Sequence, residues 1–505
     1  MDLFFVVLSG ILLFLFAFFV RVKPIWKKRY RGCDAYYYLL CAEELRRNRR
    51  IPVVLPHYYL LDNREQWYPP GFPALLSLFP EKFVKKYYWI VSPVIDCLVL
   101  ILLYVLTYRI TGSILTATIA GFLYSISFPV IFECESLNSR PLAALLLMIT
   151  MLGLFGFVLS HGILFLIITL IVGSFLLMTH KMSAQLLYFI LPIMSLVFWD
   201  SHYILMLLGI VATTFIISKG FFIKVLKGHH DILSFWNRNW KNLGANQVYS
   251  SPVYGDEDRE DPKRVHQRGI KSFYRQIQYL GLNVFVVLLI FPMLHYNQLS
   301  LFHKQMLWWG ILTYVLAILT MAIPRLRFLG EGAKYLRKAV FPVSYLAVTP
   351  FYYEWNVGLY FYPLLILTIL AAIGITVWRA RLIELSPSWS NPALEGNLAS
   401  IVRYLKENDE VSAILSIPAH PMDTIAYHCR KKVLWGTHSD NFQAVEPLFP
   451  IFRRPLEFFI TTYNLSHVLI DTEYVKPDLL RLSPPNMVFS AGNFQVYKVG
   501  TNKGG

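Results

Sequence analysis

The sequence predicts a polytopic α-helical membrane protein that carries a small soluble α/β domain at its C-terminus. Of its 505 residues, 56% are hydrophobic and only 15% are charged, whereas soluble globular domains contain about 25% charged residues. Apolar runs long enough to cross a bilayer, which takes about 20 residues, recur as far as Arg381. Beyond that residue short apolar segments alternate with polar ones, a pattern typical of a soluble domain.

The apolar runs predict about eleven membrane-spanning helices within residues 1–385. We expect them at residues 3–22, 87–108, 112–132, 140–159, 162–179, 183–199, 202–218, 278–296, 305–323, 339–356 and 358–378. The first run lacks the basic start and the small-residue cleavage site of a signal peptide, so we expect it to be a membrane anchor. Aromatic residues make up 16% of the chain, as expected where Trp and Tyr line the membrane interfaces.

The first long loop, residues 23–86, contains the stretch DAYYYLLCAEELRRN. Ala35, Leu39, Ala42 and Leu45 recur at helical spacing on one face of this stretch, and its charged residues face elsewhere. Such a pattern predicts a helix that lies in the membrane interface.

The C-terminal segment, residues 386–505, alternates strand-like and helix-like pieces from VSAILSIP at 411–418 to NFQVYKV at 493–499. Short apolar strands that alternate with helices predict a small α/β domain with a partly parallel sheet. The segment contains neither a glycine-rich phosphate loop nor a G-x-S-x-G elbow. This favours a domain that supports or caps a site in the membrane part.

The formal net charge is +16, which indicates an anionic partner. Nucleic acid is not expected, because the basic residues fall in loops between apolar spans; anionic membrane lipids or a phosphate-bearing substrate fit better. The five cysteines show no C-x-x-C spacing. They therefore predict neither a disulfide framework nor a metal knuckle.

The distribution of ionisable residues predicts one chemically active face. Because every span carries the chain across the bilayer, the loops after odd-numbered spans share a face, which then holds Asp34, Glu133, Glu135, His180, Lys181, residues 324–338 and the C-terminal domain. The main charges of the opposite face are Arg109, Asp200 and Lys304. The positive-inside rule accounts for the basic residues on this face but not for the acidic ones. Carboxylates at span boundaries are costly, and they favour a functional site.

Three carboxylates are candidates for chemistry on this face. Asp34 opens the predicted interfacial helix, where it could be an N-cap, a general base or a metal ligand. Glu133 and Glu135 lie in FECESLNSRP and could share a divalent cation such as Mg²⁺ or Mn²⁺. In a helix these two side chains would point about 200° apart, so the shared ion requires an extended backbone.

Cations around these acids could hold a phosphate. Arg140 could either neutralise one glutamate or bind phosphate through its planar fork. His180 and Lys181 end the fifth predicted span, where such residues commonly act as snorkelling anchors. The segment PRLRFLGEGAKYLRK, residues 324–338, surrounds two glycines with basic residues. It could grip a phosphate or pyrophosphate, or a lipid headgroup.

Taken together, these motifs resemble those of the GT-C superfamily of membrane glycosyltransferases, which includes the oligosaccharyltransferase catalytic subunits. The matching pieces, in chain order, are D-A-Y-Y-Y-L from Asp34, the Tyr68-Pro69-Pro70 turn, ESLNSRPLAALLL from Glu135, RFLGEGAKYL from Arg327 and the soluble domain at the C-terminus. The resemblance covers the membrane part in layout and only these short motifs in residues.

The resemblance implies transfer of a sugar from a polyprenyl phosphate or pyrophosphate carrier. It implies Asp34 as base or metal ligand, Glu133 and Glu135 as the second acidic motif, and carrier-phosphate contacts from Arg327, Glu331 and Tyr335. Residue type and position add Arg140, His180, Lys181 and Arg325 as further candidates for binding the donor phosphate. The WWDYG signature of oligosaccharyltransferases is absent from residues 387–505, and the second motif reads E-C-E in place of a D-x-D or E-x-D. These departures argue against peptide N-glycosylation and leave metal dependence open.

We therefore expect a glycosyltransferase of the cell membrane, with a lipid-linked donor and an active face outside the cytoplasm. The charge bias alone would place that face inside, but phosphate binding is a second explanation for the cations, and long loops obey the positive-inside rule poorly. The alternative is a multispan transporter or flippase of a lipid-linked or anionic solute. Transporters carry ionisable residues near the bilayer midplane, often in two related halves, whereas the predicted spans are nearly free of charge and show no repeat.

Overall fold

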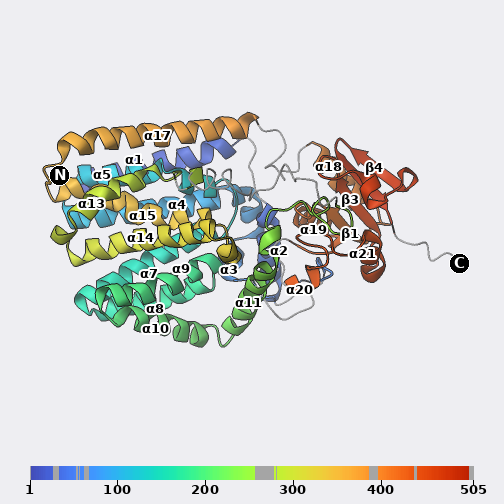
Figure 1. The fold of residues 1–505 in the computed structure, drawn as a ribbon, viewed down its shortest axis with the longest axis horizontal. Coiled ribbons are helices and arrows are strands. Elements are labelled where there is room, and N and C mark those ends of the chain that lie inside the picture. The colour runs from blue at the N-terminus through green and yellow to red at the C-terminus, as the bar shows by residue number, and fades with distance from the viewer. Residues whose placement is uncertain are drawn as a thin grey trace. The chain divides into compact units, whose positions relative to one another are not determined.

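The computed structural model describes residues 2–26, 33–52, 55, 57–61, 68–255, 278–279, 281–385, 396–436 and 441–499. The chain divides into two compact units, each assembled from segments far apart in the sequence (Figure 1). The membrane unit comprises Met1–Arg29, Tyr87–Phe222 and Phe273–Ser390. The sheet unit comprises Tyr30–Lys86, Ile223–Ser272 and Asn391–Gly505.

The membrane unit is helical throughout its described residues, and a helix lies within each of the predicted spans. Its elements are α1 (Asp2–Val22), η1 (Lys23–Ile25), α4 (Glu81–Thr111), α5 (Ile114–Ser125), α6 (Phe128–Glu133), α7 (Arg140–Ser160), α8 (Ile163–Leu177), α9 (Lys181–Phe198), α10 (His202–Ile217), η3 (Val284–Leu289), α13 (Ile290–Leu294), η4 (Tyr296–Gln298), α14 (Leu301–Ala322), η5 (Pro324–Leu329), α15 (Ala333–Leu346), α16 (Thr349–Tyr352) and α17 (Gly358–Leu385).

The predicted count of about eleven spans is not confirmed. Among the described residues, six helices are long and apolar enough to cross a membrane, or up to seven if one bent pair counts as a span. Prolines and short breaks explain the difference. The apolar run 112–132 divides into α5 and α6, with Pro129 in the first turn of α6, and the run 339–356 divides into α15 and α16, with Pro350 in the first turn of α16.

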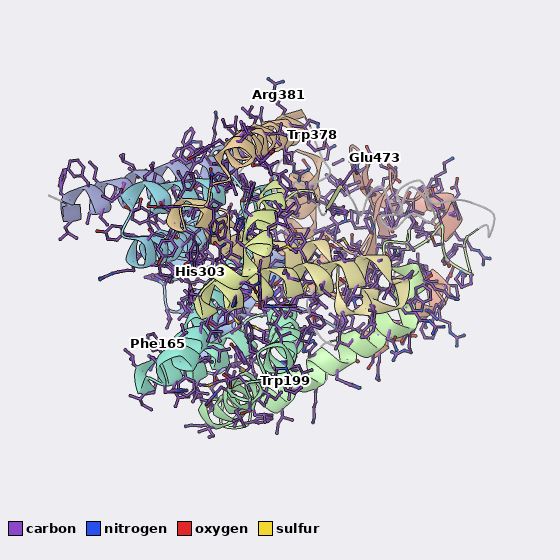
Figure 2. All side chains as sticks on the ribbon, turned by 60° about the vertical axis from the view of Figure 1, so that its left-hand side comes forward. Phe165, Trp199, His303, Trp378, Arg381 and Glu473 are labelled. Atoms are coloured by element: carbon purple, nitrogen blue, oxygen red, sulfur yellow. The ribbon has the colours of Figure 1, made fainter. Side chains whose placement is uncertain are left out.

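The core of the membrane unit lies around α14 and α15. Trp309 of α14 is fully buried and stacks on Phe341 of α15, with Phe155 of α7 edge-on to it. In the apolar stretch of α14, 67% of the residues are buried, against 17% in that of α1 and 22% in that of α17. The exposed apolar side chains of α1 and α17, such as Trp378 (Figure 2), are the surface that a lipid-facing helix presents.

The sheet unit joins helices to a mixed sheet. Its elements are α2 (Cys33–Asn48), α3 (Gly71–Ser77), α11 (Phe222–Asn239), η2 (Trp240–Asn242), α18 (Asn397–Glu407), β1 (Ala413–Ile417), α19 (Met422–Cys429), β2 (Lys432–Val433), α20 (Phe442–Val445), α21 (Leu456–Tyr463), β3 (His467–Asp471), η6 (Pro477–Leu480), η7 (Pro484–Asn486), β4 (Met487–Ala491) and β5 (Phe494–Lys498).

The sheet has the strand order β2-β1-β3-β5-β4. Strand β1 is parallel to both β2 and β3, with Ile414 beside Val433 and His467, whereas β5 runs antiparallel to β3 and β4. The partly parallel sheet predicted for the C-terminal segment is therefore present. Strand β4 and helix α18 were not predicted. The sequence of β4, MVFSA, shows no alternation of apolar and polar residues, and three of its five residues are exposed.

The first loop is built into this sheet. Tyr59 forms a parallel bridge with Val433 on the outer side of β2, and the amide of Leu60 donates to the carbonyl of Val433 at 2.9 Å. The Tyr59 hydroxyl donates to Asp423 at 2.7 Å. Residues from the start of the chain thus extend a sheet formed near its end.

The predicted first-loop helix is present as α2, and it packs inside the sheet unit. Its residues 35–42 are all buried. Tyr36 lies against Tyr427 and His428, and Tyr38 lies edge-on to Phe72. The placement of residues 23–86 at the membrane interface stays a prediction.

Candidate functional site

The membrane unit contains a buried chain of alternating charges. Glu133, the last residue of α6, accepts a hydrogen bond of 2.7 Å from Nη1 of Arg337. Nη2 of Arg337 donates to Asp96 Oδ1 at 2.7 Å, and Asp96 Oδ2 accepts from Nε of Arg21 at 2.6 Å. Tyr124 also donates to Asp96, at 2.9 Å. We call Arg21, Asp96, Arg337 and Glu133 the buried ion network.

This network compensates its own charge. Its two guanidinium groups and two carboxylates come from α1, α4, α15 and α6, and none of the four residues is more than 5% exposed. Burial alone would raise the pKa of Glu133, but the charges of Arg337, Arg140 and Lys338 outweigh burial and hold that pKa below its usual value. Glu133 is therefore ionised, as a buried ion pair requires.

Glu135 has a separate partner. Its carboxylate lies 3.5 Å from Nη2 of Arg379 in α17, and the Arg379 guanidinium also covers the ring of Phe132. Burial raises the pKa of Glu135 to about 7, and the neighbouring Arg379 opposes that shift. The two glutamates of the E-C-E motif are thus engaged by different arginines.

As placed, Glu133 and Glu135 do not fit a shared divalent cation. One oxygen of Glu133 is bonded to Arg337 and the other lies 3.9 Å from Arg140, so its negative charge is already matched. Among the described residues, no group of three or more His, Cys, Asp or Glu side chains could hold a metal ion.

The predicted phosphate-binding residues of the membrane unit gather where three helices begin. Arg140 is the first residue of α7, His180 caps α9 by accepting from the amide of Ser183, and Lys181 is the first residue of α9. Tyr335, in the first turn of α15, donates to Gln185 of α9 at 2.8 Å. Since Arg337 and Arg140 both lie beside Glu133, the N-terminal ends of α7, α9 and α15 are neighbours.

Helix N-termini carry partial positive charge and backbone N–H groups that favour anions. At this end of the membrane unit that field adds to the charges of Arg140 and Lys181, and of Lys334 on α15. Such an arrangement suits a phosphate better than a cation. We call it the N-terminal cation cluster.

The glycines of residues 324–338 serve packing. A Cβ on Gly332 would lie 2.4 Å from the backbone oxygen of Ala317, so α15 can approach α14 this closely only with glycine there. Gly330 has a φ of +121° and lies against Met182. Close helix contact therefore accounts for Gly332, and the approach of a phosphate to this segment stays a prediction.

The remaining residues of this segment lie at its surface. Arg325 is exposed, Arg327 is half-buried with Nη2 3.5 Å from the carbonyl of Met321, and Glu331 is exposed beside Lys334 at 3.2 Å. Their contact with a carrier phosphate stays a prediction.

Asp34 lies in the first turn of α2, in the sheet unit, and is half-buried. The helix begins one residue earlier, at Cys33, so Asp34 lies inside the helix and not at its cap. The helix dipole at this position favours the ionised carboxylate. Its convergence with Glu133 and the N-terminal cation cluster stays a prediction, because these groups belong to the other compact unit.

Of the buried ion network, the sequence indicated Glu133 and the general basic character of residues 324–338, the segment that contains Arg337. It did not indicate Asp96 or Arg21. Asp96 lies within the apolar run WIVSPVIDCLVL, and Arg21 ends the first predicted span. An ionisable residue in such a run marks a functional or structural site with a partner. That signal could have identified both residues, although not which arginine each acid would bind.

No family model matches the chain, and no curated protein matches it either. Solved structures of the Archaeoglobus fulgidus oligosaccharyltransferase do match. The structure with a tethered acceptor peptide superposes with a TM-score of 0.59 at 14% identity, covering 97% of this chain and 74% of that one.

Two further structures of that archaeal enzyme agree. The one named AglB, in complex with an inhibitory peptide and a dolichol-phosphate, has a TM-score of 0.58 at 13% identity over 97% of this chain and 74% of that one. The complex with Zn and sulfate has a TM-score of 0.56 at 13% identity over 92% and 68%. The chain thus shares its fold with the archaeal oligosaccharyltransferase, an enzyme of the GT-C type that the sequence motifs resemble.

Proposed function

We propose that the protein is a membrane glycosyltransferase that transfers a sugar from a lipid-linked polyprenyl phosphate or pyrophosphate donor to an acceptor on the extracytoplasmic side. One observation supports this most: a GT-C fold whose membrane unit brings the starts of α7, α9 and α15 together with their cations. This is a site of the right charge for a carrier phosphate. The dolichol-phosphate in the AglB complex is a ligand of that chemical class.

The proposed reaction forms one bond and breaks one bond at C1 of the sugar. An acceptor oxygen attacks C1 of the sugar, the bond from C1 to the phosphate oxygen breaks, and that electron pair stays on the departing phosphate. Asp34 accepts the proton of the acceptor. The N-terminal cation cluster, with the predicted carrier contacts Arg140, Lys181 and Tyr335, stabilises the phosphate, since fixed cations and helix ends act most strongly where charge develops.

The acceptor is proposed to differ from that of the archaeal enzyme. The tethered peptide with its NVT sequon belongs to that enzyme. The WWDYG signature expected for peptide recognition is absent from residues 387–505. A hydroxyl acceptor on a glycan or lipid fits the proposal better than an asparagine side chain.

The proposal is tested by incubating purified protein with radiolabelled polyprenyl-phosphate and polyprenyl-pyrophosphate sugars in the presence of membrane extract as acceptor source. We expect label to move from the carrier to a new product with one carrier class. Absence of transfer from every carrier, with protein that is folded in detergent, would refute it.

The buried ion network is the observation that favours the second candidate, a transporter or flippase, because transporters carry ionisable residues between helices. Here the charges of that network are matched within it, which favours a structural role. Reconstitution into liposomes separates the two: a flippase moves a fluorescent lipid-linked sugar between leaflets without breaking its bond to phosphate, and a transferase breaks it.

The proposed orientation predicts which residues a membrane-impermeant maleimide reaches in intact cells. Glu473 is exposed in the sheet unit (Figure 2), and Ser201 is exposed in the loop before α10. Among the described side chains the native cysteines are buried, so a Cys33→Ser background leaves little competing reaction. We expect labelling of Glu473→Cys and protection of Ser201→Cys; the reverse pattern would place the sheet unit in the cytoplasm.

A further inference from the structure

Lys338 is a fully buried cation of the membrane unit. It lies on α15 next to Arg337, and none of its surface is exposed. Within the described part of the chain, its Nζ makes one hydrogen bond, of 3.2 Å, to the carbonyl of Lys334 on the same helix. No carboxylate of the described residues forms an ion pair with it, whereas Arg337 beside it has two.

The electrostatic surroundings of Lys338 are also unusual. Among the described acids, Glu133 has the largest effect on Lys338, and that carboxylate is bonded to Arg337. Arg337, Arg140 and Lys334 are positive neighbours. Burial therefore lowers the pKa of Lys338 to about 8, although the charge of Glu133 opposes this. An ammonium group offers three N–H donors, and the weak hydrogen bond to the Lys334 carbonyl uses one of them.

A buried charge without a counter-ion is expensive for a fold to keep. A methionine or leucine on this face of α15 would fill similar volume at no electrostatic cost. Lys338 lies beside the N-terminal cation cluster, close enough to Arg140, the first residue of α7, for their charges to interact. The missing counter-ion is therefore best explained as an anion that arrives from outside the chain.

We propose that Lys338 binds a phosphoryl oxygen of the donor's carrier headgroup and stabilises the negative charge that collects there as the bond to C1 breaks. The catalytic role of Lys338 rests on the proposed function. Its phosphate binding rests on the geometry alone. In the breaking step the electron pair of the C1–O bond moves onto the phosphate, so its charge grows beside a fixed ammonium group. Stabilisation of that kind raises kcat more than it lowers KM.

The test compares Lys338→Met with Lys304→Met, which removes a cation from α14 of the same unit. Lys304 is half-buried, and its ammonium group lies 5.0 Å from the ring centre of Tyr296, so it is a control outside the proposed phosphate site. We expect Lys338→Met to lower kcat by about 100-fold, the size seen when one donor to a developing charge is removed, with KM changed by less than about threefold. Lys338→Arg should recover part of the rate, and Lys304→Met should lose little.

A binding measurement separates this proposal from the proposed function. Thermal unfolding in detergent is followed with polyprenyl phosphate, polyprenyl pyrophosphate, inorganic phosphate or phosphatidylglycerol. We expect the polyprenyl carriers to raise the midpoint of the wild type and not that of Lys338→Met, whose midpoint without ligand should equal or exceed that of the wild type. If this holds without sugar transfer, the phosphate site stands and the transferase assignment fails. An equal ligand shift in both proteins, a response to phosphatidylglycerol alone, or a destabilised Lys338→Met would overturn the proposal.

Discussion

Replacing Asp34 with alanine is expected to abolish sugar transfer while leaving expression and folding intact. The side chain lies in the first turn of α2 and is half-buried, so its loss creates no large cavity. General-base catalysis contributes about 10²–10⁴-fold to a rate, and a carboxylate near a helix N-terminus stays ionised and able to accept a proton. The measurement is the initial rate of label transfer by purified protein, at matched amounts of folded protein.

Three further variants make this result interpretable. Asp34→Asn keeps the shape of the side chain and removes its basicity, so it should be as inactive as Asp34→Ala. Asp34→Glu keeps the charge and should retain measurable activity. Glu44→Ala removes a carboxylate later in α2 that pairs with Arg47 at 3.7 Å, and it should transfer sugar normally. Full activity in Asp34→Ala would remove the catalytic assignment, whereas loss in Glu44→Ala as well would point to damage of α2.

The membrane fold could be predicted in outline because hydrophobicity is a local property of the sequence. Runs such as 3–22 and 140–159 correspond closely to α1 and α7. The number of spans could not be predicted, since run length does not show where a helix breaks. Within the run 112–132, α5 ends at Ser125 and α6 begins at Phe128. Only packing decides whether two such helices act as one span.

The sheet unit was predicted in its strands and not in its assembly. The apolar segment VSAILSIP at 411–418 became β1, because buried parallel strands are continuous apolar runs. The pairing of Tyr59 with Val433 joins segments that are far apart in sequence and too short to show periodicity. The same holds for Asp231 in α11, which accepts from the amide of Phe442 at 2.9 Å.

The candidate site shows the same division between local and tertiary information. The sequence indicated Glu133 as a functional acid, and its position at the end of α6 makes it prominent. Which group would bind Glu133 depends on α15, more than two hundred positions later. The carboxylate predicted as a metal ligand is therefore bonded to Arg337, a result of helix packing that residue type and spacing do not contain.

The second large effect is expected at Asp96, the residue that joins the two arginines of the buried ion network. Counting the ion pairs of the described residues, Asp96→Ala leaves the guanidinium of Arg21 without an acid partner and that of Arg337 with Glu133 alone. Removing one partner of a buried pair costs about 3–5 kcal/mol. We expect a loss of that size in the free energy of unfolding, measured by denaturant titration in detergent, together with poor expression.

A comparison with Arg21→Met and with Asp200→Ala tests the reason for this loss. In Arg21→Met the acid Asp96 keeps Arg337 at 2.7 Å and the hydroxyl of Tyr124 at 2.9 Å, so the cost should be smaller than that of Asp96→Ala. Asp200 is half-exposed and pairs with His202, where an ion pair contributes at most about 1 kcal/mol, and its loss should be nearly neutral. If Arg21→Met proved as destabilising as Asp96→Ala, the arginine and not the shared carboxylate would be the centre of the network. Equal stability of all three variants would mean that water or lipid replaces these ion pairs.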